Sequence, residues 1–124
     1  MGRPLSEADE AAFARAVRLT RDLPNVEVST SYGMPGLKVG GKVFANLCSE
    51  PGALAVHCPL ETKAILIEAA PDLYFDTPHF SGWPSVLVRM GAIGDGPLAV
   101  RLEAAWMLRA PKPLLRRRRE GRAD

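Results

Sequence analysis

Residues 31–45 read SYGMPGLKVGGKVFA, two apolar-containing runs separated by a pair of glycines. Two-residue hairpin loops need positive φ, which glycine adopts without steric cost, so Gly40-Gly41 predicts the tip of a β-hairpin. The implied register pairs Val39 with Lys42, Lys38 with Val43 and Leu37 with Phe44. Lys38 and Lys42 then border the tip, and the sequence predicts a basic hairpin on an apolar stem.

The segments on either side of this hairpin predict an α+β fold. Apolar residues at helical spacing, with capping and proline signals, predict helices over residues 6–23, 59–70 and 95–110. Alternating patterns bounded by turn residues predict strands over residues 26–32, 42–48, 53–58 and 85–90. With the first arm of the hairpin, this gives an antiparallel sheet of about five strands with helices packed on one face. Phe44 and the alternating Val43, Ala45 and Leu47 are all apolar. The pattern therefore does not decide whether residues 42–48 are buried on one face of the sheet or on both.

The charge is distributed unevenly along the chain. Residues 1–108 hold nine Lys or Arg against twelve Asp or Glu, a net charge of −3, whereas residues 109–124 hold seven against two, a net charge of +5. We expect one domain over residues 1–112, followed by a basic tail over residues 113–124 that is mobile unless Leu114 and Leu115 dock. Attraction to a polyanion is therefore concentrated at the C-terminal end of the sequence.

The sequence predicts a cytoplasmic protein. The first ten residues carry four charges and no apolar core, unlike a secretory signal, and no apolar run approaches the roughly 18 residues of a membrane span. The two cysteines, Cys48 and Cys58, lie at different heights on neighbouring predicted strands, so we expect free thiols that are buried or half-buried.

Four blocks of the sequence resemble the MmcQ/YjbR family of small bacterial proteins. In order they are SYGMPGLKVGGKVFA, PLETKAILIEAAPDLYFDTPHF, GWPSVLVRM and EAAWMLRAPK, and together they extend from about Leu23 to Lys112. The resemblance implies a CyaY-like, double-wing fold and a DNA-binding role. Phe80 stands where the family's Thr-Pro-His-Tyr motif has tyrosine, so a role that needs the phenolic hydroxyl is not expected here.

The nucleic-acid hypothesis rests on cations at three places. The candidate phosphate contacts are Lys38, Lys42, Arg89, Arg116, Arg117, Arg118 and Arg119. Lysines at a hairpin tip also serve solubility and protect an edge strand, and an arginine-rich terminus can simply be solvated. We expect weak, largely electrostatic contact with DNA.

Half of the aromatic residues lie within residues 74–83, which motivates a second hypothesis. Such a stretch could line a pocket for a small molecule or peptide. The candidate pocket residues are Tyr74, Asp76, His79, Phe80 and Trp83. A third hypothesis is a protein-interaction domain that uses its sheet face.

Signals for catalysis and for cofactors are weak. Asp76 and His79 are three residues apart and could form a carboxylate-oriented imidazole, although a rigid turn explains them more simply. The histidines and cysteines lack metal-ligand spacing, and the sequence has no phosphate loop, nucleophile elbow or dinucleotide motif. We therefore expect a protein that is not an enzyme and that holds no cofactor and no metal.

Overall fold

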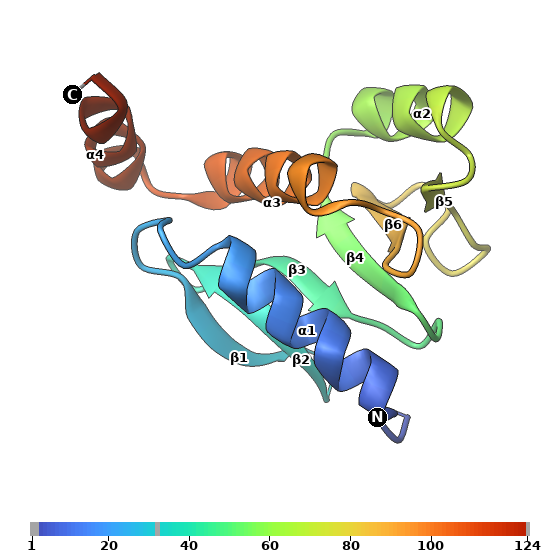
Figure 1. Ribbon diagram of the computed structural model, residues 1–124. Coiled ribbons are helices and arrows are strands. Elements are labelled where there is room, and N and C mark those ends of the chain that lie inside the picture. Colours follow the sequence, from blue (N-terminus) through green and yellow to red (C-terminus); the bar gives the residue numbers. More distant parts are fainter. Residues whose placement is uncertain (1–2, 32, 124) are drawn as a thin grey trace.

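The computed structural model describes residues 3–31 and 33–123 and shows one antiparallel sheet with helices packed against it (Figure 1). The helices are α1 (Glu7–Leu19), α2 (Leu60–Ala69), α3 (Asp95–Arg109) and α4 (Lys112–Ala123). The strands are β1 (Glu27–Ser31), β2 (Met34–Val39), β3 (Lys42–Leu47), β4 (Ala53–His57), β5 (Tyr74–Phe75) and β6 (Ser85–Arg89). Their order in the sheet is β1-β2-β3-β4-β6-β5, and the α+β prediction is confirmed. The sheet has a sixth strand beyond the five expected, the two-residue β5.

The hairpin between β2 and β3 forms at the predicted glycines. Gly40 and Gly41 have φ of 58° and 79°, as a two-residue primed turn requires. The predicted pairs Val39 with Lys42 and Lys38 with Val43 are confirmed, but Leu37 pairs with Ala45 and not with Phe44.

A β-bulge at Phe44 explains this register error. The register shifts between Leu37 and Lys38, which leaves Phe44 without a partner on β2. A bulge places one extra residue in a strand and so turns two consecutive side chains toward the same face. Phe44 and Ala45 are both buried in the main core, and β3 can therefore be apolar at consecutive positions while one layer of helices covers the sheet.

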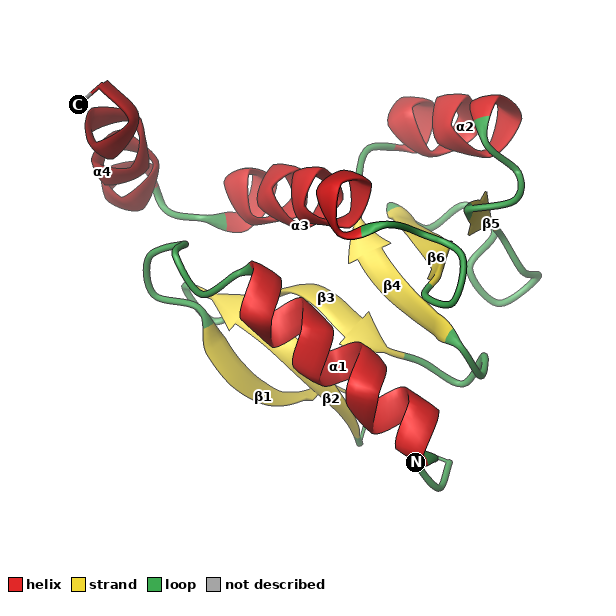
Figure 2. Cartoon of the chain, in the orientation of Figure 1, coloured by secondary structure: helices red, strands yellow, loops and turns green. Residues whose placement is uncertain are grey.

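The main core lies between the sheet and the helices, and α1 and α3 cover the central strands in Figure 2. Trp106, Leu98 and Leu102 on α3 are fully buried against the strands. The indole Nε1 of Trp106 donates to the carbonyl of Pro24 at 3.0 Å, which ties α3 to the connection between α1 and β1. Burial of an aromatic side chain with its polar atom satisfied makes Trp106 the principal anchor of α3.

Residues 112–123 form the helix α4, and both leucines of this segment dock. Leu114 is buried, and Leu115 is half-buried against the same core. Arg118 joins α4 to the body, because its Nε lies 3.0 Å from Glu103 Oε2 and its Nη2 lies 3.4 Å from Asp22 Oδ2. Most of the arginine-rich segment is thus presented on a helix with a defined position.

Both cysteines are free and buried, as predicted. Burial raises the pKa of Cys58 above its ordinary value, which opposes formation of a reactive thiolate. Within residues 3–31 and 33–123, no helix is long and apolar enough to cross a membrane.

The tip glycines offer a matched test of how the hairpin is held. A Cβ on Gly40 would lie 3.0 Å from Cδ and Cγ of Pro111, whereas a Cβ on Gly41 would meet nothing within 4 Å. Both positions have positive φ, so we expect Gly41→Ala to cost about 1 kcal/mol and Gly40→Ala about 2 kcal/mol of unfolding free energy. Urea denaturation measures both values, and equal costs would show that the tip does not pack on Pro111.

Candidate nucleic-acid interface

The hairpin tip and the start of α4 meet, although about 70 residues separate them in the sequence. The link is the close approach of Gly40 to the ring of Pro111, which immediately precedes Lys112. Lys42 is exposed beside the tip, and Lys112 is exposed at the first position of α4. We call this region the basic end and define it as Lys42, Lys112, Arg116, Arg117 and Arg119.

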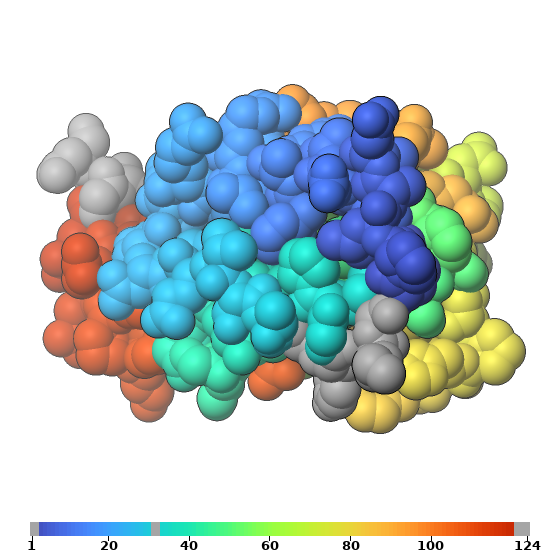
Figure 3. Space-filling view, turned by 90° about the horizontal axis from the view of Figure 1, so that it is seen from below, coloured from blue at the N-terminus to red at the C-terminus, as the bar shows by residue number. Residues whose placement is uncertain are grey.

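Helical geometry arranges the cations of α4. Lys112, Arg116 and Arg119 follow one another at i, i+4 and i+7, which places them on one face of the helix. These three residues and Arg117 are exposed. Arg118 is committed instead to its ion pairs with Glu103 and Asp22 and so belongs to the scaffold. Figure 3 shows α4, in red, beside the segment between α1 and β1, in light blue.

The two hairpin lysines do not act as a pair. Partners in an antiparallel ladder lie on the same face, so Lys42 shares a face with Val39, and Lys38 shares the other face with Val43. On that second face Lys38 also lies opposite Glu27 of β1 in the ladder, so an acidic residue is its cross-strand neighbour. Only Lys42 is therefore assigned to the basic end.

Arg89 lies away from the basic end. It pairs with Ala53 at the start of β4, whereas Val56, near the end of β4, pairs with Ala45 toward the hairpin tip. Ala53 and Val56 are three residues apart on β4, a separation of about 10 Å at the strand rise of roughly 3.3 Å per residue. The guanidinium carbon of Arg89 lies 4.1 Å from the centroid of the Phe75 ring, a cation–π contact within the sheet face.

The sequence did not predict that His57 and Arg109 would lie near each other at the hairpin end of β4. Burial, and after it the charge of Arg109, lower the pKa of His57 below its ordinary value, so the imidazole is neutral at pH 7. The Nε of Arg109 is buried and has no hydrogen-bond partner among the residues that the structure describes. No sequence signal marks this pair, because the two residues meet only through the packing of α3 across the sheet.

The candidate pocket residues of the aromatic stretch lie in different environments. Tyr74 is buried in the main core, and Phe80 is half-buried against a smaller cluster on the opposite face of the sheet. His79 and Trp83 are exposed, and His79 stands edge-on to Phe80 at 5.0 Å between ring centroids. The five candidate pocket residues are thus distributed over core and surface.

Lys63 organises this stretch, and sequence reasoning missed it. Its ammonium lies 2.8 Å from the carbonyl of Phe80, 3.2 Å from that of Trp83 and 3.0 Å from Asp76 Oδ1. The lysine is only 5% exposed, so its three donors are used within the protein. Because Asp76 pairs with Lys63, the structure gives no support to an Asp76–His79 general base.

An open groove runs along α2 beside the contacts that Lys63 makes. Asp76 is the one candidate pocket residue that lines it. The lining residues are Leu60, Lys63, Ala64, Ile67, Glu68, Asp76 and Gly82. Among the described residues, no group of three or more His, Cys, Asp and Glu could hold a metal ion.

The chain belongs to the YjbR family, since the sequence model described as YjbR matches residues 21–108. Uncharacterized proteins of Mycobacterium tuberculosis and Mycobacterium bovis are similar to it, each 45% identical over 53 residues. The aligned segment covers 43% of this chain and 41% of each relative, so the chain matches less than half of their length. No solved structure matches at a significant level. Helix α4 lies outside the matched residues, so its arginines are not part of the family match.

Proposed function

We propose that the protein binds DNA through the phosphate backbone and that the basic end is the contact surface. The observation that carries the proposal is the packing of the hairpin tip on Pro111, which gathers Lys42 and the exposed cations of α4 at one end of the molecule. We propose a binding role, in the cytoplasm, and no catalytic one.

The charge distribution supports a DNA contact at the basic end. Residues 1–108 carry a net charge of −3 and residues 109–124 a net charge of +5, so the field orients a polyanion toward α4. Lysine and arginine contacts to phosphates release counterions but do not distinguish bases. We therefore propose weak binding that depends strongly on salt and little on sequence.

The test is the salt dependence of binding to a fluorescently labelled DNA duplex. For the full-length protein, log Kobs should fall linearly with log salt concentration between about 50 and 200 mM, because each phosphate contact adds roughly 0.9 to the slope. The triple variant Lys112→Gln/Arg116→Gln/Arg117→Gln should make the slope shallower by about 2.7.

A matched pair of single variants locates the interface. Arg116→Gln should make the slope shallower by roughly 1, whereas Arg89→Gln, which neutralises an exposed arginine away from the basic end, should leave it unchanged. Equal effects of the two variants would place the binding elsewhere. If the full-length protein shows no salt-dependent binding to the duplex, the proposal is wrong.

A further inference from the structure

Helix α3 carries a second apolar stripe that faces away from the core. Its buried side is formed by Leu98, Leu102, Ala105 and Trp106. On the opposite side Val100 and Met107 share a face at a spacing of seven residues, and Leu108 lies next to them. Val100 is 57% exposed, Met107 47% and Leu108 51%. A single exposed apolar residue is common on a protein surface, but three on one side of a helix form an apolar patch. Such a patch indicates a binding surface.

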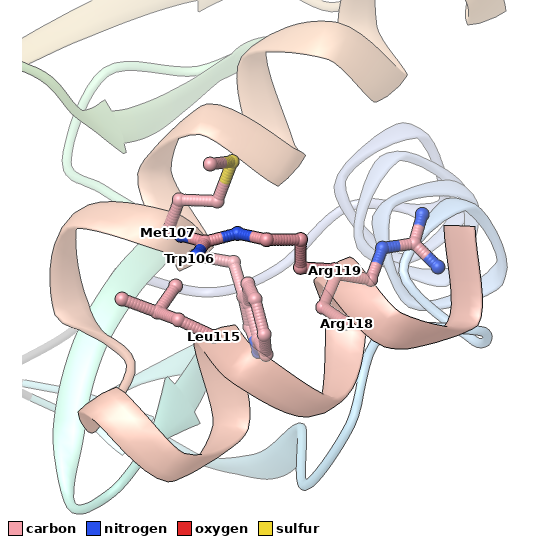
Figure 4. Close-up of a pocket in the computed structure, with 5 residues that line it drawn as sticks. All are labelled: Trp106, Met107, Leu115, Arg118 and Arg119. Atoms are coloured by element: carbon pink, nitrogen blue, oxygen red, sulfur yellow. The ribbon is translucent and has the colours of Figure 1, made fainter. Parts of the chain in front are cut away.

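A cavity adjoins this stripe where α3 meets α4. It is lined by Trp106, Met107, Leu115, Arg118 and Arg119 and has a volume of about 150 Å³. Figure 4 shows Met107 and Leu115 bordering the space, the Arg119 side chain reaching across toward Met107, and Arg118 turned away from it. A cavity of about 150 Å³ accepts one benzene-sized group, so this space fits a single leucine or phenylalanine side chain.

The rim of this surface carries more arginines than acids, since Glu103 of α3 is paired with Arg118 and α4 adds the exposed Glu120. Arg119 belongs to the cavity wall, and Arg116 lies on the same face of α4. Arg101 follows Val100 on α3 and is half-exposed. A symmetric contact between two copies of the chain would bring these arginines against themselves, which electrostatic repulsion opposes. The surface therefore favours an acidic partner over a second copy.

We infer that the surface formed by α3 and α4 docks an acidic amphipathic helix of a partner protein. An apolar side chain of that helix fills the cavity, its other apolar residues cover Val100 and Leu108, and its carboxylates pair with Arg116 and Arg119. A flat bilayer would leave a one-side-chain cavity unfilled, and DNA phosphates would gain nothing from the apolar stripe. The inference shares Arg116 and Arg119 with the proposed DNA contact but rests on the apolar residues, which that contact does not use.

The probe is a fluorescein-labelled peptide of 16 residues with leucine at i, i+3, i+4 and i+7, repeated, and glutamate at most other positions. We expect anisotropy to show saturable binding to the full-length protein, and a scrambled peptide of equal composition to bind at least tenfold more weakly. Equal binding of the two peptides would mean that charge alone drives association, which would overturn the inference.

Two valines provide the matched variants. Val100 lies on the proposed surface, and Val28 on β1 has a similar exposure of 61% but lies on the sheet edge. We expect Val100→Ser to weaken binding of the amphipathic peptide about fivefold or more and Val28→Ser to leave it unchanged, with duplex binding the same for both. Thermal unfolding confirms that each variant folds. Equal peptide affinities would overturn the inference.

A vesicle assay distinguishes the membrane alternative. Vesicles with about 30% phosphatidylserine should bind no more tightly to wild type than to Val100→Ser. Binding to these vesicles that depends on Val100, together with no preference for the amphipathic peptide, would replace the proposed partner with a membrane surface.

Discussion

Replacing Lys63 with methionine should lower the free energy of unfolding by about 3 kcal/mol, because a buried charged donor is removed from three acceptors. The ammonium serves the carbonyls of Phe80 and Trp83 and the carboxylate of Asp76. Methionine keeps an unbranched side chain of similar length and so isolates the loss of the donor. Urea denaturation gives the value, and the midpoint of thermal unfolding should fall by roughly 10 °C.

The exposed Lys42 provides the control, since Lys42→Met removes the same charge from a solvated site and should change stability little. Hydrogen exchange distinguishes local from global loss. Faster exchange confined to residues 76–84 would show that Lys63 stabilises only this segment and not the whole domain. If the free energy of unfolding changes by less than about 1 kcal/mol and hydrogen exchange is unchanged, Lys63 does not hold the aromatic stretch in place.

The second large effect concerns the start of α1. Asp9 is buried and accepts from Arg3 Nη1 at 2.6 Å, from Arg3 Nη2 at 2.8 Å and from the backbone N–H of Ser6 at 3.0 Å. Arg3 also donates from Nε to the carbonyl of Cys48, so the cluster ties the beginning of α1 to the end of β3. We expect Asp9→Asn to cost about 2 kcal/mol, the sum of a weakened helix cap and a broken, partly exposed ion pair.

The pH dependence gives an independent check on Asp9. Hydrogen bonds from Arg3 and Ser6 hold the pKa of this carboxyl well below its ordinary value of 3.8. The unfolded state therefore binds more protons near that pH, and the stabilisation is present above about pH 4 and is lost as the pH falls.

The difference in stability between wild type and Asp9→Asn should accordingly be constant near neutral pH and shrink below about pH 4. Asp95→Asn, which removes ion pairs at an exposed site, should have a much smaller effect at neutral pH. A difference for Asp9→Asn that does not change between pH 7 and pH 3 would contradict an ionised Asp9 in the folded protein.

Local rules predicted much of this fold from the sequence. The tip at Gly40-Gly41 needs only the conformational freedom of glycine, and the α3 stripe that contains Leu98 and Trp106 needs only helical periodicity. The bulge at Phe44 was not predictable in this way, because two consecutive apolar residues fit either a bulge or a strand covered on both faces. That choice depends on the helices that pack on the sheet.

The sites were harder to predict, since they depend on distant contacts. Lys63 occupies an ordinary position in a helical pattern, and nothing in the sequence states that the Phe80 and Trp83 carbonyls will point at it. The candidate cations were named from the sequence, but their grouping was not. Lys42 joins the α4 arginines only through the packing of Gly40 on Pro111, while Arg118 is used by internal ion pairs.

The most direct measurement is a titration of the ¹⁵N-labelled protein with a short DNA duplex, followed by backbone amide chemical shifts. If the basic end is the interface, the shifts move together at the hairpin tip and along the first turns of α4, revert when salt is added, and leave Arg89 unaffected. Shifts centred on Arg89 or on the loop beside Lys63, or no shifts at low salt, would contradict a DNA contact at the basic end.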